Sequence, residues 1–243
     1  MMPALGEGGA EGGGGKRSYV RDMFSAIAPR YDLLNRVLSF NLDRSWRRRA
    51  LGALRWERRP AGRYLDACAG TMDLAMMLAG ARGFAGSLVA ADFATPMLRH
   101  GCPKVAGRRV FPAAADSLRL PFPDGAFDGA IVGFGVRNFA DLDAGLAELA
   151  RVLAAGARLV VLEFSRPPSA LVRGAVRFYN HRVLPFVGRM VSGHPTAYTY
   201  LPQSMDEFPG ADELSRRLAD CGLRSAAYER LLGGTVAIHW GER

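Results

Sequence analysis

The strongest constraint in this sequence is the alternation of short apolar segments with amphipathic helical segments between residues 63 and 164. Strand-like segments are expected at 63–67, 87–92, 109–115, 127–134 and 157–164. Helical segments between them are expected at 73–82, from about Thr95, and at 142–153. Such alternation predicts a mostly parallel sheet with helices on both faces. The 127–134 segment is apolar throughout, as a strand buried on both faces should be.

The end of the chain departs from this alternation. A helix is expected at 211–222, followed by two strand-like segments that Gly233 and Gly234 join through a turn. An antiparallel hairpin at the edge of an otherwise parallel sheet is typical of one class of folds that bind nucleotide cofactors. The segment 165–209, which precedes the helix, is too long to be a plain connection and is interpreted as an insertion that forms part of a pocket.

The chain divides into three expected regions. Residues 1–16 are rich in glycine and are expected to be a disordered tail. Residues 17–62 carry apolar side chains at three- and four-residue steps, which predicts a helical cap that Pro29 interrupts. Residues 63–243 form the expected cofactor-binding core, including the insertion. A chain of 243 residues fits one large domain or one core with a cap.

Positive charge is concentrated in the first quarter of the chain. Residues 1–63 contain 13 basic and 6 acidic side chains, against 19 and 17 in the remainder. This asymmetry predicts one basic face and argues against a nucleic-acid-binding protein. Because 30 of the 32 basic residues are arginine, a coding bias is the alternative explanation. Two arginine-bearing segments, 44–49 and 170–191, could contact an anionic membrane surface. The alternative for segment 170–191 is a helix that covers the core and exposes a basic edge to solvent.

Other classes of protein are disfavoured by single features. Cys68, Cys102 and Cys221 stand far apart, which predicts neither a zinc site nor a disulfide framework. The sequence has no uninterrupted apolar run long enough to span a bilayer and no apolar stretch of the signal-peptide type. The expected location is therefore the cytoplasm, with peripheral contact at the inner face of the membrane as an extension. A homo-oligomer is compatible with the sequence.

A strand, a loop of small residues and a helix start predict a cofactor cradle at residues 66–73. Asp66 ends the first strand, and Gly70 and Thr71 lie in the loop. Small residues let the backbone approach a ligand, and a helix N-terminus favours negative charge. Cys68 and Met72 stand where glycine is expected, so the loop alone fits a structural turn equally well.

Acidic side chains end the next two strands. Asp92 is placed to accept both hydroxyl groups of a ribose, or to cap the helix that starts near Thr95. Asp116 and Ser117 follow the third strand, where they are placed to bind the exocyclic amine of an adenine. The triphosphate-binding lysine motif is absent from the sequence, which favours S-adenosylmethionine over ATP and leaves NAD open.

The chain resembles the quinone C-methyltransferases of menaquinone and ubiquinone biosynthesis over about residues 20–241. The most specific stretches are FGVRNF at 134–139 and YNHRVLPFVGRMVSGHPTAYTYLPQSMDEFP at 179–209. Others are MFSAIAPRYDLLNRVLS (23–39), DRSWRR (43–48), LPFPDGAFD (120–128) and LVVLEFSRP (159–167). The resemblance implies a Rossmann-like class I methyltransferase fold with a seven-stranded sheet, and S-adenosylmethionine as cofactor.

The resemblance also implies the cofactor positions. They fall on Thr71, Asp92, Asp116 and Ser117, with Gly133 at a position where many members carry serine. The loop departs from the family, which reads closer to CGTGD where this chain has AGTMD at 69–73. Our hypothesis is that the loop turns the side chain of Met72 away from the cofactor.

The implied acceptor is a ring carbon of a polyprenyl hydroquinone, which needs alignment and a route for a proton. Arg137 is a candidate to hold a phenolate, or to pair with Asp141 or Asp143 instead, and Asn138 to orient the hydroxyl. Further candidates are Tyr31, Asp32, His181, His194, Tyr198 and Tyr200. No metal cluster is expected.

The apolar wall of the acceptor pocket is expected from Phe24, Ile27, Leu34, Phe178, Leu184, Phe186 and Val187. The residues do not distinguish a naphthoquinol from a benzoquinol acceptor. Two alternatives stay open at this point. One is a methyltransferase for another lipid-like or phenolic acceptor, and the other is a non-catalytic protein of a quinone-synthesis complex that keeps the fold.

Overall fold

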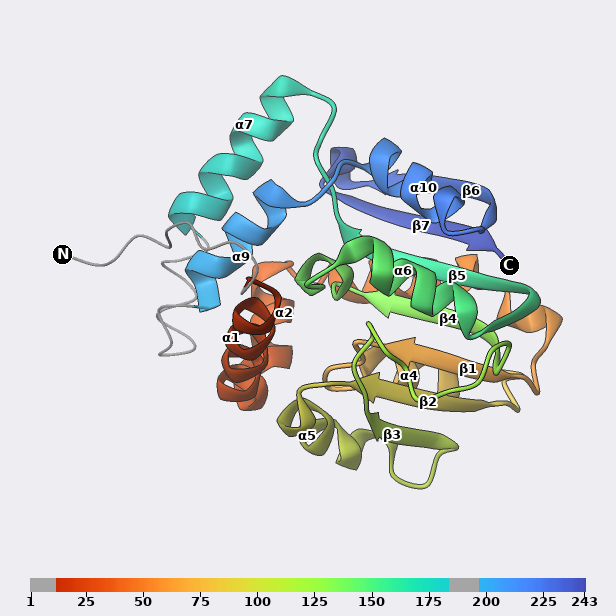
Figure 1. The fold of residues 1–243 in the computed structure, drawn as a ribbon. Coiled ribbons are helices and arrows are strands. Elements are labelled where there is room, and N and C mark those ends of the chain that lie inside the picture. The colour runs from red at the N-terminus through yellow and green to blue at the C-terminus, as the bar shows by residue number, and fades with distance from the viewer. Residues whose placement is uncertain (1–11, 184–196) are drawn as a thin grey trace.

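The computed structural model describes residues 12–183 and 197–243, and its centre is a seven-stranded sheet in the order β3-β2-β1-β4-β5-β7-β6 (Figure 1). The first five strands run parallel, and β7 is antiparallel to both β5 and β6. The expected fold class is confirmed. The strands are β1 (Arg63–Ala67), β2 (Ser87–Asp92), β3 (Val110–Ala114), β4 (Phe127–Gly133), β5 (Leu153–Phe164), β6 (Arg224–Leu231) and β7 (Val236–Glu242).

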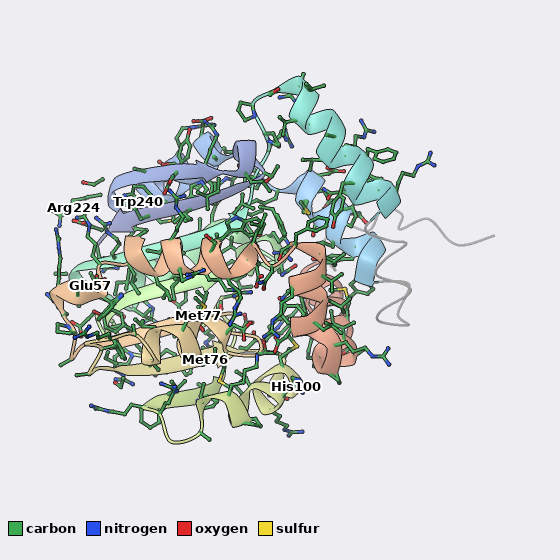
Figure 2. All side chains as sticks on the ribbon, turned by 180° about the vertical axis from the view of Figure 1, so that it is seen from behind. Glu57, Met76, Met77, His100, Arg224 and Trp240 are labelled. Carbon is green, nitrogen blue, oxygen red and sulfur yellow. The ribbon has the colours of Figure 1, made fainter. Side chains whose placement is uncertain are left out.

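Helices cover both faces of the sheet. One face carries α6 (Leu142–Arg151) and α10 (Ala211–Asp220), and the other carries α3 (Asp43–Ala53), α4 (Asp73–Ala79) and α5 (Thr95–Val105). Figure 2 shows α3 and α4 across the second face, with Met76 and Met77 on α4. Strand β4 contacts both layers of helices, because Ala130 and Val132 pack into one core cluster and Ile131 into the other. Side chains on both of its faces are buried, which accounts for its uninterrupted apolar sequence.

A helical cap lies at the edge of the sheet where the parallel strands end (Figure 1). It contains α1 (Gly12–Ile27), the 3₁₀ turn η1 (Ala28–Arg30), which holds Pro29, and α2 (Tyr31–Leu38). At the same edge lie α7 (Ala170–Phe178), the π-helical turn η4 (Tyr179–Val183) and α9 (Ala197–Glu207). Short 3₁₀ turns complete the described elements: η2 (Trp56–Arg58), η3 (Val136–Asn138) and η5 (Leu232–Gly234).

Two boundaries differ from expectation. Helix α1 begins at Gly12, inside the segment expected to be a disordered tail, although glycine is a poor helix former. The rest of that expected tail lies outside the described residues. Strand β5 begins at Leu153 because that residue pairs with Phe127 ahead of a register shift in the ladder. Within residues 12–183 and 197–243, no helix has the length and apolarity to cross a membrane.

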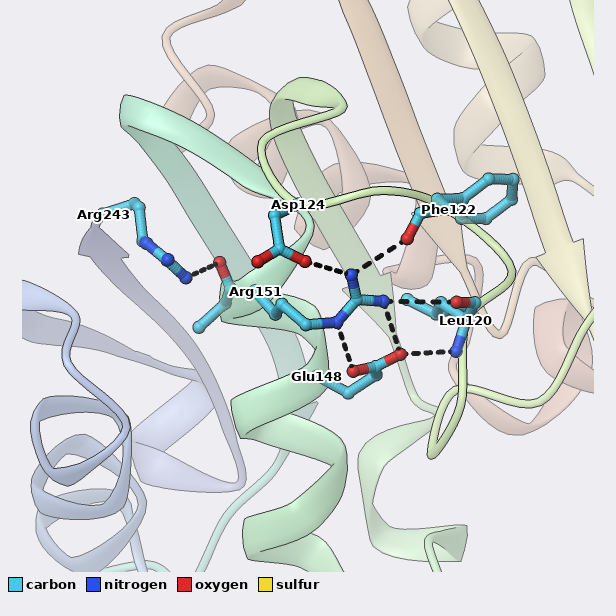
Figure 3. Close-up of polar contacts among 7 residues, drawn as sticks. Leu120, Phe122, Asp124, Glu148, Arg151 and Arg243 are labelled. Atoms are coloured by element: carbon cyan, nitrogen blue, oxygen red, sulfur yellow. Dashed lines mark hydrogen bonds and ion pairs between the residues drawn. The ribbon is translucent and has the colours of Figure 1, made fainter.

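The LPFPDGAFD stretch is held in place by a partly exposed polar cluster (Figure 3). Arg151 of α6 donates to the carbonyl oxygens of Phe122 (2.9 Å) and Leu120 (3.2 Å) and to the carboxylate of Asp124 (2.6 Å). Glu148 accepts from the backbone N–H of Leu120 at 2.7 Å. The guanidinium of Arg151 keeps the pKa of Glu148 below its ordinary value. This stretch therefore anchors the chain before β4, away from the pockets.

Candidate functional site

Two adjoining cavities lie beneath the cap. The first encloses about 680 Å³ and is lined by loop residues that follow β1 to β4, among them Gly70, Asp92, Asp116 and Ser117. The second encloses about 920 Å³ and is mostly apolar and aromatic. Phe24, Tyr31 and Phe134 line both cavities. Ligands of open α/β sheets bind at this edge, so we call the first cavity the cofactor pocket and the second the acceptor pocket.

The loop after β1 has three left-handed residues, of which only one is glycine. Cys68, Gly70 and Met72 have φ angles of +53°, +53° and +63°. A left-handed conformation costs a residue with a side chain about 1 kcal/mol or more. The side chain of Met72 is fully buried, and its terminal methyl lies 2.9 Å from where a Cβ on Gly101 would stand. Met72 therefore packs under α5 and does not line the cofactor pocket, as the hypothesis for this loop expected.

Asp92 joins the loop to the start of α5. Its two carboxylate oxygens accept from the backbone N–H groups of Gly70 and Ala94, each at 2.8 Å. Burial raises the pKa of Asp92 to about 6, although both hydrogen bonds oppose the shift. Each oxygen keeps a free lone pair for a ribose hydroxyl. The alternative that Asp92 caps α5 is wrong, because the N-cap is Ala94 and no side chain caps the helix.

Asp66 and Thr71, both expected to bind the cofactor, do not line the cofactor pocket. Asp66 is buried and accepts from the backbone N–H of Ala75 at 2.9 Å, which fixes the start of α4. Burial raises the pKa of Asp66 to about 7. The hydroxyl of Thr71 donates to Asp32 at 2.5 Å. Both residues support the loop from outside the cavity, because the loop turns its backbone inward.

Asp116 and Ser117, expected to bind the adenine, line the cofactor pocket. Asp116 accepts from the backbone N–H of Leu118 at 3.0 Å and pairs with Arg17 of α1 at 2.8 Å. The hydroxyl of Ser117 lies 3.4 Å from the sulfur of Cys68. Arg17 also lines this cavity, so α1 closes it from above.

Gly133 lines the cofactor pocket at the end of β4. A Cβ at this position would stand 2.7 Å from Cδ1 of Leu74. The glycine at this position therefore allows α4 to pack closely against β4, and a serine here would require Leu74 to shift.

These residues fit S-adenosylmethionine. The buried carboxylate of Asp92 matches a ribose, and the exposed backbone at Gly70 leaves space where a side chain would stand. Among the described residues no group of three His, Cys, Asp or Glu side chains is placed to hold a metal ion.

Arg137 lines the acceptor pocket and is paired with a buried glutamate. Its Nη1 donates to Glu163 at 2.9 Å and to the carbonyl oxygen of Phe134 at 2.5 Å. Burial raises the pKa of the fully buried Glu163 against the pull of the guanidinium. The alternative partners were wrong, because Asp141 accepts from the backbone N–H of Ala144 and Asp143 pairs with Arg217.

Asn138 connects the two pockets. It lines the cofactor pocket, and its side-chain oxygen accepts from the hydroxyl of Tyr200 at 3.1 Å. Tyr200, on α9, lines the acceptor pocket, and burial raises the pKa of its phenol. Because Tyr200 occupies the amide oxygen, the amide N–H₂ of Asn138 is left to donate.

Tyr31 and Asp32 have different surroundings although they are adjacent in sequence. Tyr31 lines both pockets and packs edge-on against Phe24, with ring centroids 5.9 Å apart. Asp32 lines neither pocket and instead binds Thr71 and Lys104. Burial raises the pKa of Asp32, but these two hydrogen bonds outweigh it and bring the pKa below its ordinary value. Asp32 therefore ties the cap to the cofactor loop.

The expected acceptor wall is only partly in place. Phe24, Ile27 and Leu34 line the acceptor pocket, whereas Phe178 is 65% exposed on α7. His181 also lies outside the pocket, where it pairs with Asp206 at 3.1 Å. The expectations for Leu184, Phe186, Val187, His194 and the side chain of Tyr198 lie outside the described residues. Sequence reasoning missed Glu163 and placed Arg47 on the outer basic face, although both are buried at this site.

Comparison with known proteins agrees with this site. The model of the ubiE/COQ5 methyltransferase family matches residues 14–243. The chain is 51% identical to a demethylmenaquinone methyltransferase from Thermus thermophilus, over 91% of this chain and all of that protein. It is 43% identical to a ubiquinone/menaquinone biosynthesis C-methyltransferase from Geobacter sulfurreducens, over 94% of this chain and 90% of that protein.

Solved structures show the fold. A SAM-dependent methyltransferase from Thermotoga maritima superimposes with a TM-score of 0.63 at 16% identity, covering 91% of this chain and 98% of its own. A second such protein, from Methanococcus maripaludis, gives 0.59 at 16% identity, covering 99% and 97%. The sheet order, the paired cavities and these similarities together show that the chain belongs to the ubiE/COQ5 methyltransferase family.

Proposed function

We propose that this protein transfers the methyl group of S-adenosylmethionine to a ring carbon of demethylmenaquinol, yielding menaquinol. The observation that carries the proposal is the wall shared by the two cavities, made of Phe24, Tyr31 and Phe134. This wall brings a carboxylate-lined cofactor pocket next to an apolar, aromatic pocket suited to a planar ring with an apolar tail. The similarity to demethylmenaquinone methyltransferases supports the same acceptor.

The chain's residues prepare the acceptor for attack. The bound cofactor supplies an electrophilic methyl group on a sulfonium. The guanidinium of Arg137 stabilises a deprotonated ring hydroxyl, which makes the neighbouring ring carbon nucleophilic. Glu163 orients that guanidinium, and Asn138 donates to the ring hydroxyl while Tyr200 fixes its amide. The new carbon–carbon bond forms as the carbon–sulfur bond breaks, and the ring carbon then releases its hydrogen as a proton to water.

A methyl-transfer assay with reduced demethylmenaquinone and with its benzoquinol counterpart tests the proposal, with mass spectrometry of the products. We expect methylation of the naphthoquinol, and a loss of about 100-fold or more in kcat for Arg137→Ala and Asn138→Ala. Arg166→Ala, on the exposed surface before α7, is the matched control and should keep full activity. Near-normal turnover by both site variants would contradict the assigned roles.

We also propose that the face beside the acceptor pocket docks on an anionic lipid bilayer. Large apolar side chains are exposed there on α2, on the turn after it and on α7: Leu33 (54%), Phe40 (76%), Leu171 (85%) and Phe178 (65%). The rings of Phe40 and Tyr179 lie 6.3 Å apart, and the Tyr179 hydroxyl donates to the Leu38 carbonyl oxygen, so the two segments are adjacent. Leu38 and Tyr179 line the acceptor pocket, which opens beside this face.

The positive charge on this face also supports an anionic bilayer as its partner. Exposed arginines accompany these apolar side chains, namely Arg36, Arg44, Arg177 and Arg182. Apolar insertion combined with attraction to anionic headgroups is typical of interfacial binding. We expect cosedimentation with phosphatidylglycerol vesicles that weakens with salt, with weak binding to phosphatidylcholine vesicles. Phe40→Ser with Phe178→Ser should reduce it about tenfold. Equal binding to both vesicle types would reject the proposal.

A further inference from the structure

The acceptor pocket contains a second buried guanidinium, that of Arg47 on α3. Arg47 is 6% exposed and lines this pocket. Its neighbour Asp43 lies 3.5 Å from its Nε and already accepts from the hydroxyl of Ser39 at 3.0 Å. Nε of Arg47 is buried without a hydrogen-bond partner among the described residues. A buried cation with so little compensation favours an anion beside it.

The guanidinium of Arg47 lies where the two pockets meet. Its Cζ is 5.7 Å from the ring centroid of Phe134, which lines both cavities. Its Nη1 is 3.6 Å from where a Cβ on Gly133 would stand, and Gly133 lines the cofactor pocket. This position is therefore close to where a methyl group passes between the two pockets.

Arg47 and Arg137 each lie beside one ring of a tilted aromatic pair. The rings of Phe134 and Phe164 have centroids 4.9 Å apart, and the Cζ of Arg137 lies 5.4 Å from the Phe164 ring. The two cations differ in charge balance. Arg137 has the fully buried Glu163 at 2.9 Å, whereas Arg47 pairs with Asp43 at the longer distance of 3.5 Å and interacts through space with the buried Asp66. Arg47 is therefore the more weakly paired cation of the two, and its Nε has no hydrogen-bond partner among the described residues.

We infer that Arg47 binds the acceptor directly, its guanidinium donating to an anionic oxygen on the planar ring and favouring the phenolate over the phenol. This inference rests on the proposed function for its substrate class. It adds a cation beside Phe134 to the one that Arg137 places beside Phe164. A planar fork of N–H donors suits a charged oxygen better than a neutral one.

The inference predicts a pH effect. A free phenol titrates near pH 10, and a nearby cation lowers that value. The charged groups around Arg47 come from its own helix, from α2, from β1, from the start of α4 and from the acceptor pocket: Asp43, Arg44, Arg48, Arg36, Asp66, Asp73 and the Arg137–Glu163 pair. Loss of the Arg47 charge should lower the rate at neutral pH by about tenfold or more and move the rising limb of the pH–rate profile to higher pH. A change of packing alone would lower the rate at every pH.

Two probes of similar shape test the anion site directly. 2-Hydroxy-1,4-naphthoquinone is an anion at neutral pH, and 1,4-naphthoquinone is its neutral counterpart. Calorimetry should show that the protein binds the anion about tenfold more tightly or better. Arg47→Gln should remove this preference while the affinity for the neutral probe changes by less than about threefold. Arg47→Lys should keep part of the preference, and Arg48→Gln, at an exposed neighbouring position, should keep all of it.

The outcomes separate the two proposals. Arg47 lies outside the cofactor pocket lining, so binding of S-adenosylhomocysteine by Arg47→Gln should match that of the unmodified protein and show that the variant is folded. An unchanged anion preference in Arg47→Gln, or no preference in the unmodified protein, would overturn the inference. Failure to methylate either quinol, with the anion preference present and dependent on Arg47, would overturn the proposed function and leave the anion site standing.

Discussion

Met72 adopts a backbone conformation in the cofactor loop that is unfavourable for a residue with a side chain. Its φ of +63° is a conformation that glycine adopts freely, and a residue with a side chain pays about 1 kcal/mol for it. The side chain is fully buried against Gly101, so packing offsets the strain. The turn therefore retains its shape, and the cofactor pocket retains its volume, without glycine at this position.

Replacing Met72 separates these two effects. Met72→Gly should relieve the strain but leave a cavity, with a net loss of about 1–3 kcal/mol in the free energy of unfolding. Met72→Ala, which keeps the strain, should lose about 1 kcal/mol more. Urea denaturation measures both. Affinity for S-adenosylhomocysteine should change by less than about threefold in either variant, and an increase of about tenfold in Met72→Gly would show instead that the side chain enters the pocket.

Asp66 makes the stability of the protein depend on pH. Its pKa is raised to about 7 in the folded state, so between its unfolded value near 4 and pH 7 the folded state binds more protons. Its contribution to stability is therefore present at low pH and is lost as pH rises through about 7. Relative to the unmodified protein, Asp66→Asn should gain stability between about pH 5 and 8. Urea titrations at both pH values test this, and a constant difference would contradict it.

At the scale of elements, the cap and the cofactor loop are joined by one cluster of charges. Lys104 of α5 pairs with Asp32 of α2 and, at 2.7 Å, with Asp73 at the start of α4. Thr71 of the loop donates to the same Asp32. The cluster ties three helices and the loop together at a point where Tyr31, the neighbour of Asp32, lines both pockets.

Removing the cation should loosen this junction. Lys104→Met leaves two partly buried carboxylates without a cation and should cost about 2 kcal/mol of stability, whereas Lys104→Arg should cost less than about 1. A double-mutant cycle with Asp32→Asn should give a coupling of about 1 kcal/mol at neutral pH. Because the folded pKa of Asp32 is depressed, that coupling should vanish as pH falls below its ordinary value of 3.8. Additive single effects at neutral pH would exclude the coupling.

At the scale of the whole molecule, the cofactor pocket collects residues from the cap and from the ends of four strands. A ligand there contacts most of the fold, so binding should stabilise it as one unit. S-adenosylhomocysteine at about 100 times its Kd adds about 2.7 kcal/mol, which is a rise of about 5–10 °C in Tm for a chain of this size.

The increase in Tm caused by the ligand should depend on the ionisation of Asp92. Ribose binding favours the ionised carboxylate, so the increase in Tm should shrink as pH falls through about 6, the pKa of Asp92. Asp92→Asn should weaken binding about tenfold or more and show a much smaller pH dependence. Differential scanning calorimetry with and without ligand measures both effects, and a rise independent of pH in the unmodified protein would contradict the role of Asp92.

The sequence by itself determined the strands, the covering helices and the edge where ligands bind. Strands β1 and β2 and the start of α5 match their predicted residues because apolar periodicity and turn residues act over a few neighbours. The C-terminal hairpin followed from the same local signals. The positions of Asp92, Asp116 and Ser117 at strand ends, and the resemblance for Gly133, pointed to residues that do line the cofactor pocket.

Only the tertiary structure decided which side chains face the pockets and what compensates their charge. Arg137 pairs with Glu163 across 26 positions, and Thr71 with Asp32 across 39. Arg47 and Arg48 are adjacent in one basic run, yet the first is buried at the acceptor pocket and the second faces solvent. Periodicity assigns a residue to a face of its own helix, whereas its neighbours on that face come from distant segments. Their positions are determined only when the sheet and the cap pack together.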